Sequence, residues 1–270
     1  MQGDGSRFSY PATTELELNR AGQSAASHAA IGETAAPPLP DYLVRHYWWA
    51  YIWPPAVWFF DHQPIINCIV FGQYRRLRDE TIRLLGGERA GQTLLIASAY
   101  GDVVPAMASS LAKRALTVID VAPIQIQRAT AKLRAAGLDD GVAMHLMDAE
   151  QLRFASDSHD STAFFLLLHE LPPPVRRRVV SEALRVTRPG GRLVLAEYGD
   201  RTRSHWFHRM APLRWVFGTA EPFLPTLWDL DLDSLLAEEA GKLGKRIVVD
   251  EKVSIFRGFY RAHRYFVESA

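Results

Sequence analysis

The sequence predicts a doubly wound α/β fold, in which a mostly parallel sheet carries helices on both faces. From residue 91 onward, short apolar runs rich in β-branched residues alternate with amphipathic stretches of helical period. This alternation is typical of parallel strands joined by crossover helices. Pro189-Gly190-Gly191 supplies a turn ahead of the fifth such run, and two strand-like runs end the chain.

Each predicted element is a run of residues in which apolar positions recur with the spacing of a strand or of a helix. The five parallel strands are expected at 93–97, 116–121, 142–147, 162–168 and 192–197, and the helices at 103–113, 124–136, 175–187, 205–217 and 232–242. Two further strands at 246–255 and 259–267 should form an antiparallel hairpin that turns near Arg257-Gly258. The sheet would then have seven strands.

Composition narrows the functional classes. The 270 residues are 48% apolar, which is enough for a sizeable core. A net charge of +1, with arginines scattered among acidic residues, disfavours nucleic acid as a partner. The single cysteine, Cys68, cannot form an internal disulfide, and residues 1–20 lack a secretory signal pattern. A cytoplasmic location is expected.

The chain divides into three segments by composition. Residues 1–40, rich in Ala, Ser, Thr, Gly and Pro, are expected to form a disordered tail. Residues 41–90 form an aromatic helical segment with four of the seven tryptophans, interrupted by prolines and charges, so it should lie on a membrane surface and face a quinone. The alternative is a cap packed over the core. Residues 91–270 form the cofactor-binding domain.

The loop after the first strand is a candidate cofactor site, because doubly wound sheets bind ligands beyond the carboxyl ends of their strands. It reads Ala97-Ser98-Ala99-Tyr100-Gly101-Asp102. Small residues here let backbone amides approach a nucleotide-type cofactor, although only Gly101 remains of the usual glycines. We expect Ala97, Ser98 and Gly101 to contact the cofactor; the alternative is an ordinary strand-to-helix turn.

Acidic residues follow the next strands. Asp120 ends the second strand about 20 residues after the loop, where a carboxylate can accept hydrogen bonds from both ribose hydroxyls, with Val121 beside it; the alternative is a charge at a helix N-terminus. Asp148 could accept from an adenine amino group while Ala149 offers its amide.

The fourth strand is followed by His169-Glu170-Leu171-Pro172, which puts a histidine and a carboxylate at the mouth of the site. His169 could meet a substrate or a metal there, or only cap the strand end, since one His-Glu pair has no diagnostic metal spacing.

Four segments resemble successive motifs of the ubiquinone/menaquinone biosynthesis C-methyltransferases: 118–123, 148–152, 169–172 and 184–193, with Phe60-Asp61 and Phe71-Gly72 upstream. The resemblance implies a Rossmann-like class I methyltransferase fold that binds S-adenosylmethionine (SAM). The chain departs from that family at the first loop, because Leu95 stands where an acidic residue is usual and Ser98, Ala99 and Tyr100 replace glycine or small residues.

With these departures, Tyr47 to Pro55 and Phe60 to Pro64 resemble the rhodoquinone biosynthesis protein A family. That resemblance implies conversion of a lipid quinone, ubiquinone, into rhodoquinone: an amino group donated by SAM replaces a ring methoxy group, and manganese accompanies the reaction. From its aromatic segment, the protein is expected to lie peripherally on the inner face of the membrane. The metal ligands are not identified.

Leu95 would remove a charge that keeps the amino group of SAM as ammonium, and only a neutral amine is nucleophilic. A cation or donor on the quinone oxygen would stabilise the developing charge, and His62, His169 and Tyr100 are the candidate catalytic residues. Two alternatives are a conventional SAM-dependent quinone methyltransferase and a non-catalytic quinone-binding protein.

Overall fold

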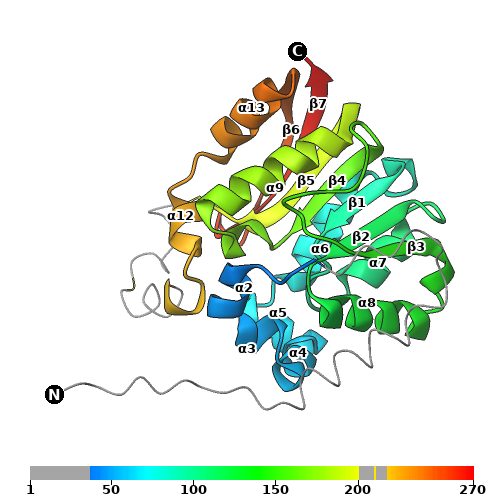
Figure 1. The fold of residues 1–270 in the computed structure, drawn as a ribbon, viewed down its shortest axis with the longest axis vertical. Helices are drawn as coiled ribbons and strands as arrows, with labels where there is room; N and C mark the ends of the chain where they lie inside the picture. The colour runs from blue at the N-terminus through cyan, green and yellow to red at the C-terminus, as the bar shows by residue number, and fades with distance from the viewer. Residues whose placement is uncertain (1–36, 201–209, 211–217) are drawn as a thin grey trace. The chain divides into compact units, whose positions relative to one another are not determined.

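The computed structural model describes residues 37–200, 210 and 218–270, which belong to one compact unit. A seven-stranded sheet runs through it (Figure 1) in the order β3-β2-β1-β4-β5-β7-β6. Its strands are β1 (Thr93–Ile96), β2 (Leu116–Asp120), β3 (Val142–Leu146), β4 (His159–Phe165), β5 (Thr187–Tyr198), β6 (Lys245–Ile255) and β7 (Tyr260–Ser269).

Strands β1 to β5 pair in parallel, whereas β7 pairs antiparallel with both β5 and β6. The chain builds β1, β2 and β3 outward and then crosses back to place β4 on the other side of β1. This reversal makes the carboxyl ends of β1 and β4 the expected ligand position. The predicted seven-stranded sheet with an antiparallel terminal hairpin is confirmed.

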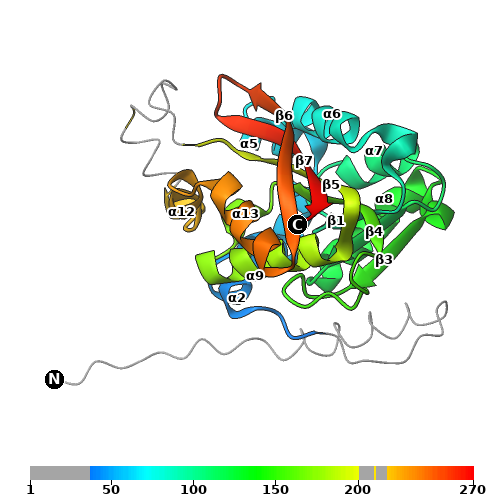
Figure 2. The same ribbon diagram turned by 90° about the horizontal axis from the view of Figure 1, so that it is seen from above.

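Helices cover both faces of the sheet (Figure 2). Helices α6 (Tyr74–Leu85), α7 (Val103–Ser110) and α8 (Pro123–Ala135) lie on one face, and α9 (Pro173–Val186) and α13 (Leu232–Lys242) lie on the other. The shorter elements are α2 (Asp41–His46), α3 (Trp48–Tyr51), α4 (Pro54–Phe60), α5 (Gln63–Ile69), α12 (Leu224–Trp228), η1 (Gly87–Ala90), η2 (Asp139–Gly141) and η3 (Leu168–Glu170). Strand β1 is buried along its whole length, as expected for a central strand of a sheet with helices on both faces.

The fourth strand was predicted at 162–168 but lies at His159–Phe165. Leu166 has a φ of 52° and donates its amide to Ala196 O (2.8 Å), so the chain leaves the extended conformation there and enters η3. The sequence stays apolar beyond the strand because Leu166 and Leu167 line a cavity and Leu168 is in the core. The apolar pattern therefore did not show where the strand ends. The helix predicted at 205–217 lies outside the described residues.

The aromatic segment is both packed and exposed. Tyr47 and Val57 are buried, whereas Trp48, Trp53 and Trp58 are each more than half exposed. Prolines begin α4 and interrupt the run, and none of the helices described is long and apolar enough to cross a membrane.

One buried carboxylate ties this segment to the sheet domain. The Asp61 side chain, 2% exposed, accepts from Arg128 Nη2 (2.9 Å) and Lys132 Nζ (2.7 Å) on α8. It also accepts from the amide of Gly101 (3.1 Å), in the loop after β1. Asp61 therefore holds the α4–α5 turn against both α8 and the candidate cofactor loop.

Candidate functional site

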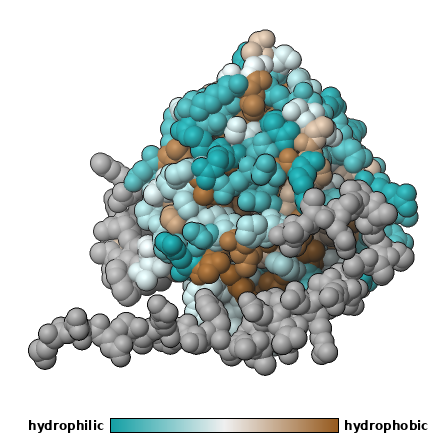
Figure 3. Space-filling view, in the orientation of Figure 1, coloured by the Kyte–Doolittle hydropathy of each residue, from teal (hydrophilic) through white to brown (hydrophobic). Residues whose placement is uncertain are grey.

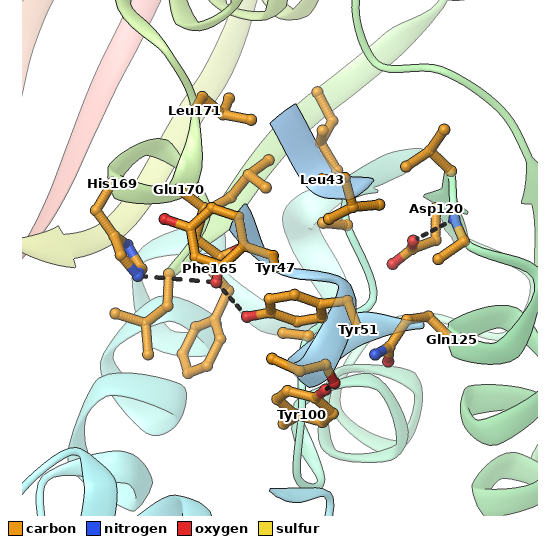
Figure 4. A pocket seen from close by; sticks show the side chains of 18 of the residues that line it. Leu43, Tyr47, Tyr51, Tyr100, Asp120, Gln125, Phe165, His169, Glu170 and Leu171 are labelled. Carbon is orange, nitrogen blue, oxygen red and sulfur yellow. Dashed lines mark hydrogen bonds and ion pairs between the residues drawn. The ribbon is translucent and has the colours of Figure 1, made fainter. Parts of the chain in front are cut away.

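A cavity of about 340 Å³ lies between the short N-terminal helices and the carboxyl ends of β1, β2 and β4 (Figure 4). Its volume is within the usual range for small-molecule sites, roughly 300–1,000 Å³. One end is lined by residues that follow β1, β2 and β3, and the other by η3 and by tyrosines of α2 and α3. We call these the cofactor end and the acid end.

Asp120 is fixed at the cofactor end by the loops around it. Its Oδ2 accepts from the amide (3.0 Å) and hydroxyl (2.9 Å) of Ser98, and its Oδ1 accepts from the amide of Ala122 (2.9 Å). Burial raises the pKa of Asp120, and these hydrogen bonds oppose that rise. The carboxylate is therefore held in one orientation against the cavity.

The loop after β1 has the backbone of a glycine-rich turn without most of the glycines. Ala97 (φ 69°) and Ala99 (φ 52°) both lie in the left-handed region that favours glycine. Such strain persists only where the surroundings enforce it, and it concentrates at functional sites. The loop is thus shaped for close approach of a ligand despite its side chains.

The predicted cofactor residues divide into two groups. Ala97, Val121, Asp148 and Ala149 line the cavity together with Asp120. Asp148 is oriented by the amide of Glu150, which donates to its Oδ1 (2.8 Å).

The other two predicted cofactor residues lie outside the set that lines the cavity. Ser98 is buried, and its hydroxyl donates to Asp120. Gly101 packs so closely on Tyr74 that an added Cβ would lie 2.5 Å from its hydroxyl oxygen. Both residues shape the loop, and the structure does not bring them to the ligand space.

At the acid end, a histidine and a carboxylate from η3 meet a tyrosine from α3. Figure 4 shows the Glu170 carboxylate between the imidazole of His169 and the hydroxyl of Tyr51. Tyr51 donates to Glu170 Oε1, and His169 Nε2 lies 3.8 Å from the same oxygen. The other ring nitrogen of His169 donates to Glu197 Oε1 (2.8 Å), which fixes the ring.

Burial and hydrogen-bonded partners set the protonation states of the side chains at the acid end. Burial alone would lower the pKa of His169, but the carboxylate of Glu197 raises it to about 9, so the imidazole is protonated at neutral pH. Burial raises the pKa of Glu170 to about 8. Burial also raises the pKa of Glu221, which accepts from the hydroxyl of Tyr47 (3.0 Å).

The described residues that line the cavity include four carboxyl side chains, those of Asp120, Asp148, Glu170 and Glu221, but neither lysine nor arginine. Their lining is otherwise largely aromatic and aliphatic. Such a cavity suits a ligand that carries positive charge and an apolar ring.

Tyr100 closes the cavity from the cofactor loop. Its hydroxyl donates to the carbonyl of Ala50, and its ring stacks on Tyr51 at 5.2 Å between centroids and 12° between planes. Burial raises the pKa of Tyr100, so the phenol is neutral and its proton is already engaged. Tyr100 thus connects the cofactor loop to the acid end through Tyr51.

Two sequence-based expectations need correction. His62 is exposed at the start of α5, its Nδ1 contacts the carbonyl of Trp58 (2.7 Å), and its ring packs on that tryptophan outside the cavity lining. Leu95 is fully buried in the core rather than at the cavity, because β1 directs it away while Ile96 lines the ligand space. Neither residue is positioned to act on a ligand in this cavity.

No group of three or more histidine, cysteine, aspartate or glutamate side chains suited to a metal ion occurs in residues 37–200, 210 and 218–270. The side chains at the acid end that could bind a metal already have hydrogen-bond partners: Glu170 accepts from Tyr51, and His169 donates to Glu197. The described residues therefore do not fit a manganese site, and no chemical step is assigned to that metal.

Residues 94–191 match a family model described as a methyltransferase domain. A solved N-methyltransferase, NodS from Bradyrhizobium japonicum in complex with S-adenosyl-L-homocysteine, superposes with a TM-score of 0.51 at 21% identity, covering 77% of this chain and 90% of that one. The chain has the class I methyltransferase fold. At this level of identity the likeness concerns the fold alone.

Curated relatives match over shorter stretches. A ubiquinone/menaquinone biosynthesis C-methyltransferase of Bdellovibrio bacteriovorus is 26% identical over 134 residues, which are 50% of this chain and 55% of that protein. A 27-O-demethylrifamycin SV methyltransferase of Amycolatopsis mediterranei is 34% identical over 111 residues, 41% of this chain and 40% of that protein. The chain thus spans about half the length of these relatives, or less.

Several residues of the site were not predicted. Glu197 is the last residue but one of β5, so the rule that ligands gather at strand ends could have found it. Tyr47 and Tyr51 carry no local signal, because they reach the cavity only when the N-terminal helices fold over the sheet. Glu221 carries none either, because it reaches the cavity from the segment before α12.

Proposed function

We propose that this protein is a SAM-dependent transferase that acts on the ring of a lipid quinone. The observation that carries the proposal is a cavity with two unlike ends, whose described lining residues include four carboxyl groups but no lysine or arginine. A sulfonium cation is favoured beside carboxylates, and a flat apolar ring is favoured between tyrosines and aliphatic side chains.

In this proposal Asp120 accepts from the ribose hydroxyls, while Asp148 and the amide of Ala149 hold the adenine at the next strand end. His169, protonated and fixed by Glu197, faces the acceptor ring as a cation. A fixed cation stabilises negative charge that develops on a ring oxygen, and it does so more strongly in a dry cavity than in water.

Methyl transfer is the first candidate for the group moved. Proteins named as quinone C-methyltransferases are among the relatives, which supports this chemistry. A ring carbon of the reduced, electron-rich quinone attacks the methyl carbon of SAM, the S–C bond breaks, and a C–C bond forms. The ring carbon then loses its proton, which leaves S-adenosyl-L-homocysteine and a methylated ring.

Amino transfer from SAM, which would convert ubiquinone to rhodoquinone, is the second candidate. The neutral amine of SAM adds to the methoxy-bearing ring carbon, and methoxide leaves as methanol. Loss of the Cα proton with reduction of the quinone ring then gives an imine, and water hydrolyses it to an aminohydroquinone and a 2-oxo acid. The observation that favours amino transfer is the altered loop, in which Tyr100 reaches across to Ala50 and stacks on Tyr51. This phenol narrows the space next to the cofactor loop and changes where the amino acid part of SAM can lie. The resemblance of the aromatic segment to the rhodoquinone proteins points the same way.

Two measurements test the proposal in sequence. Calorimetry should show that SAM binds to the purified protein, and mass spectrometry should then show SAM-dependent conversion of a ubiquinone-type quinone, supplied oxidised and reduced. A protein that binds quinone but not SAM would support the non-catalytic alternative and contradict the proposal.

We also propose that the exposed aromatic face docks on a membrane surface from which the quinone enters. Trp48, Trp53, Trp58 and Phe59 are 47 to 56% exposed on α3 and α4 and their junction. Figure 3 shows a hydrophobic patch near the place where Figure 1 draws α2, which precedes these residues in the chain. Trp49 is both part of this face and part of the cavity lining, so the face and the cavity are continuous.

Replacing Trp48 and Trp53 by alanine is expected to weaken binding to liposomes at least about tenfold, because inserting one large apolar side chain contributes roughly 1.5–3 kcal/mol. Turnover of a long-tailed quinone should fall more than that of a short-tailed analogue. Val249→Ala, which removes an exposed apolar residue from β6, is the matched control and should change neither. Equal losses on both quinones would show that the tryptophans act only as a cap.

A further inference from the structure

The acid end contains one carboxyl group placed to take part in the reaction rather than only to bind. Glu170 lines the cavity, and its side chain is 12% exposed. The other lining carboxyl groups differ from it: Asp120 and Asp148 accept from backbone amides at the cofactor end. Glu221, like Glu170, accepts from a tyrosine hydroxyl, but its partner is Tyr47, whereas Tyr51, the partner of Glu170, stacks on Tyr100 of the cofactor loop.

Within the acid end, Glu170 is linked to the cofactor loop through two tyrosine rings. Tyr51 donates to its Oε1, and the ring of Tyr51 stacks on Tyr100. Tyr100 belongs to the loop after β1, where the sulfonium and amino acid part of SAM would lie beyond the ribose held at Asp120. Glu170 therefore stands next to the place where the two ligands would meet.

We infer that Glu170 is the residue that accepts the proton released during group transfer. The inference rests on the proposed function and deepens it. In methyl transfer, the ring C–H bond breaks after the C–C bond has formed, its electron pair restores the aromatic ring, and the proton passes to a carboxylate oxygen of Glu170. In amino transfer, the same oxygen takes a proton from the ammonium nitrogen of SAM and leaves a neutral amine.

The groups around Glu170 shift the pKa of its carboxyl group. The titratable groups that face it are His169 on η3, Glu197 on β5, Glu221 before α12, Tyr51 on α3, and Tyr42, Tyr47 and Tyr100 around the cavity. Burial and Glu221 raise the pKa of its carboxyl group, while His169 and the Tyr51 hydroxyl lower it. A base whose pKa lies near the working pH can both take up and release a proton.

The test is the pH dependence of single-turnover transfer in the full-length protein with saturating SAM. Glu170→Gln keeps the shape of the side chain and should slow transfer by about 100-fold or more, the usual share of a general base, with little change in SAM affinity. In the parent protein the rate should rise with pH as Glu170 ionises. Tyr51→Phe removes a hydrogen bond that lowers the pKa of Glu170, so the rise should move to higher pH.

The control is Glu238→Gln, which changes an exposed carboxylate on α13 that does not line the cavity, and it should leave rate and pH profile unchanged. An active parent with a Glu170→Gln variant that keeps the parent rate and pH profile would overturn the inference and leave the proposed function standing. A parent inactive on every lipid quinone would overturn the proposed function itself. Carboxyl NMR gives a readout independent of turnover, because a Glu170 carboxyl that titrates in the ordinary acidic range overturns the inference.

Discussion

Asp120→Ala is expected to remove most of the affinity for SAM. One carboxylate that accepts from two ribose hydroxyls in a partly dry site contributes roughly 2–4 kcal/mol, which corresponds to about 30-fold to several-hundred-fold in the dissociation constant. The effect should be large because Asp120 is already oriented by Ser98 and Ala122 and loses little freedom on binding. Isothermal titration calorimetry with SAM measures it.

The matched control is Ser98→Ala, which removes one hydroxyl that donates to Asp120 but leaves the carboxylate and the Ser98 amide in place. Its cost should be about 1 kcal/mol or less. An Asp120→Ala protein that is folded by circular dichroism and binds SAM as tightly as the parent would place the cofactor elsewhere.

Asp61→Ala is expected to destabilise the protein by about 3–5 kcal/mol, the usual cost of removing one partner from a buried ion pair. Asp61 lies between Arg128 and Lys132, and burial already lowers the pKa of Lys132. Without the carboxylate, the ammonium group stays buried and the α4–α5 turn loses its contact with Gly101. Urea unfolding at neutral pH gives the free energy difference.

Asp41→Ala is the control for this change, because Asp41 is almost fully exposed and lies 3.9 Å from Arg45. It should have no measurable effect on the unfolding free energy. If Asp61→Ala were as stable as Asp41→Ala, the N-terminal helices would not depend on this contact.

The sheet could be predicted from the sequence because its strands are locally marked. The run around Leu94 is wholly buried, so its apolar pattern carried the information. The turn predicted at Pro189-Gly190-Gly191 is not a turn ahead of the strand: these residues lie within β5, where the pairing with β4 is irregular. The prediction failed at Leu166, where the backbone turns while the side chains stay apolar. Apolar character reports burial, and at this point burial continued after the strand had ended.

The candidate site was predictable only where it follows strand ends. Asp120 and Asp148 were placed correctly beside the cavity by this rule. His62 was proposed for its chemistry alone, and its place at the start of α5 directs it to solvent beside Trp58. Tyr51 could not be placed, because its contact with Glu170 joins residues 119 positions apart.

Isotope tracing tests most directly whether a group moves from SAM to a lipid quinone in this cavity. The protein is incubated with a ubiquinone-type quinone and SAM labelled either at the methyl carbon or at the amino nitrogen, and the quinone is recovered for mass spectrometry. We expect one of the two labels, and not both, to appear on the quinone ring: the methyl carbon for methyl transfer or the nitrogen for amino transfer. A quinone that recovers neither label, from a protein shown to bind both ligands, would contradict it.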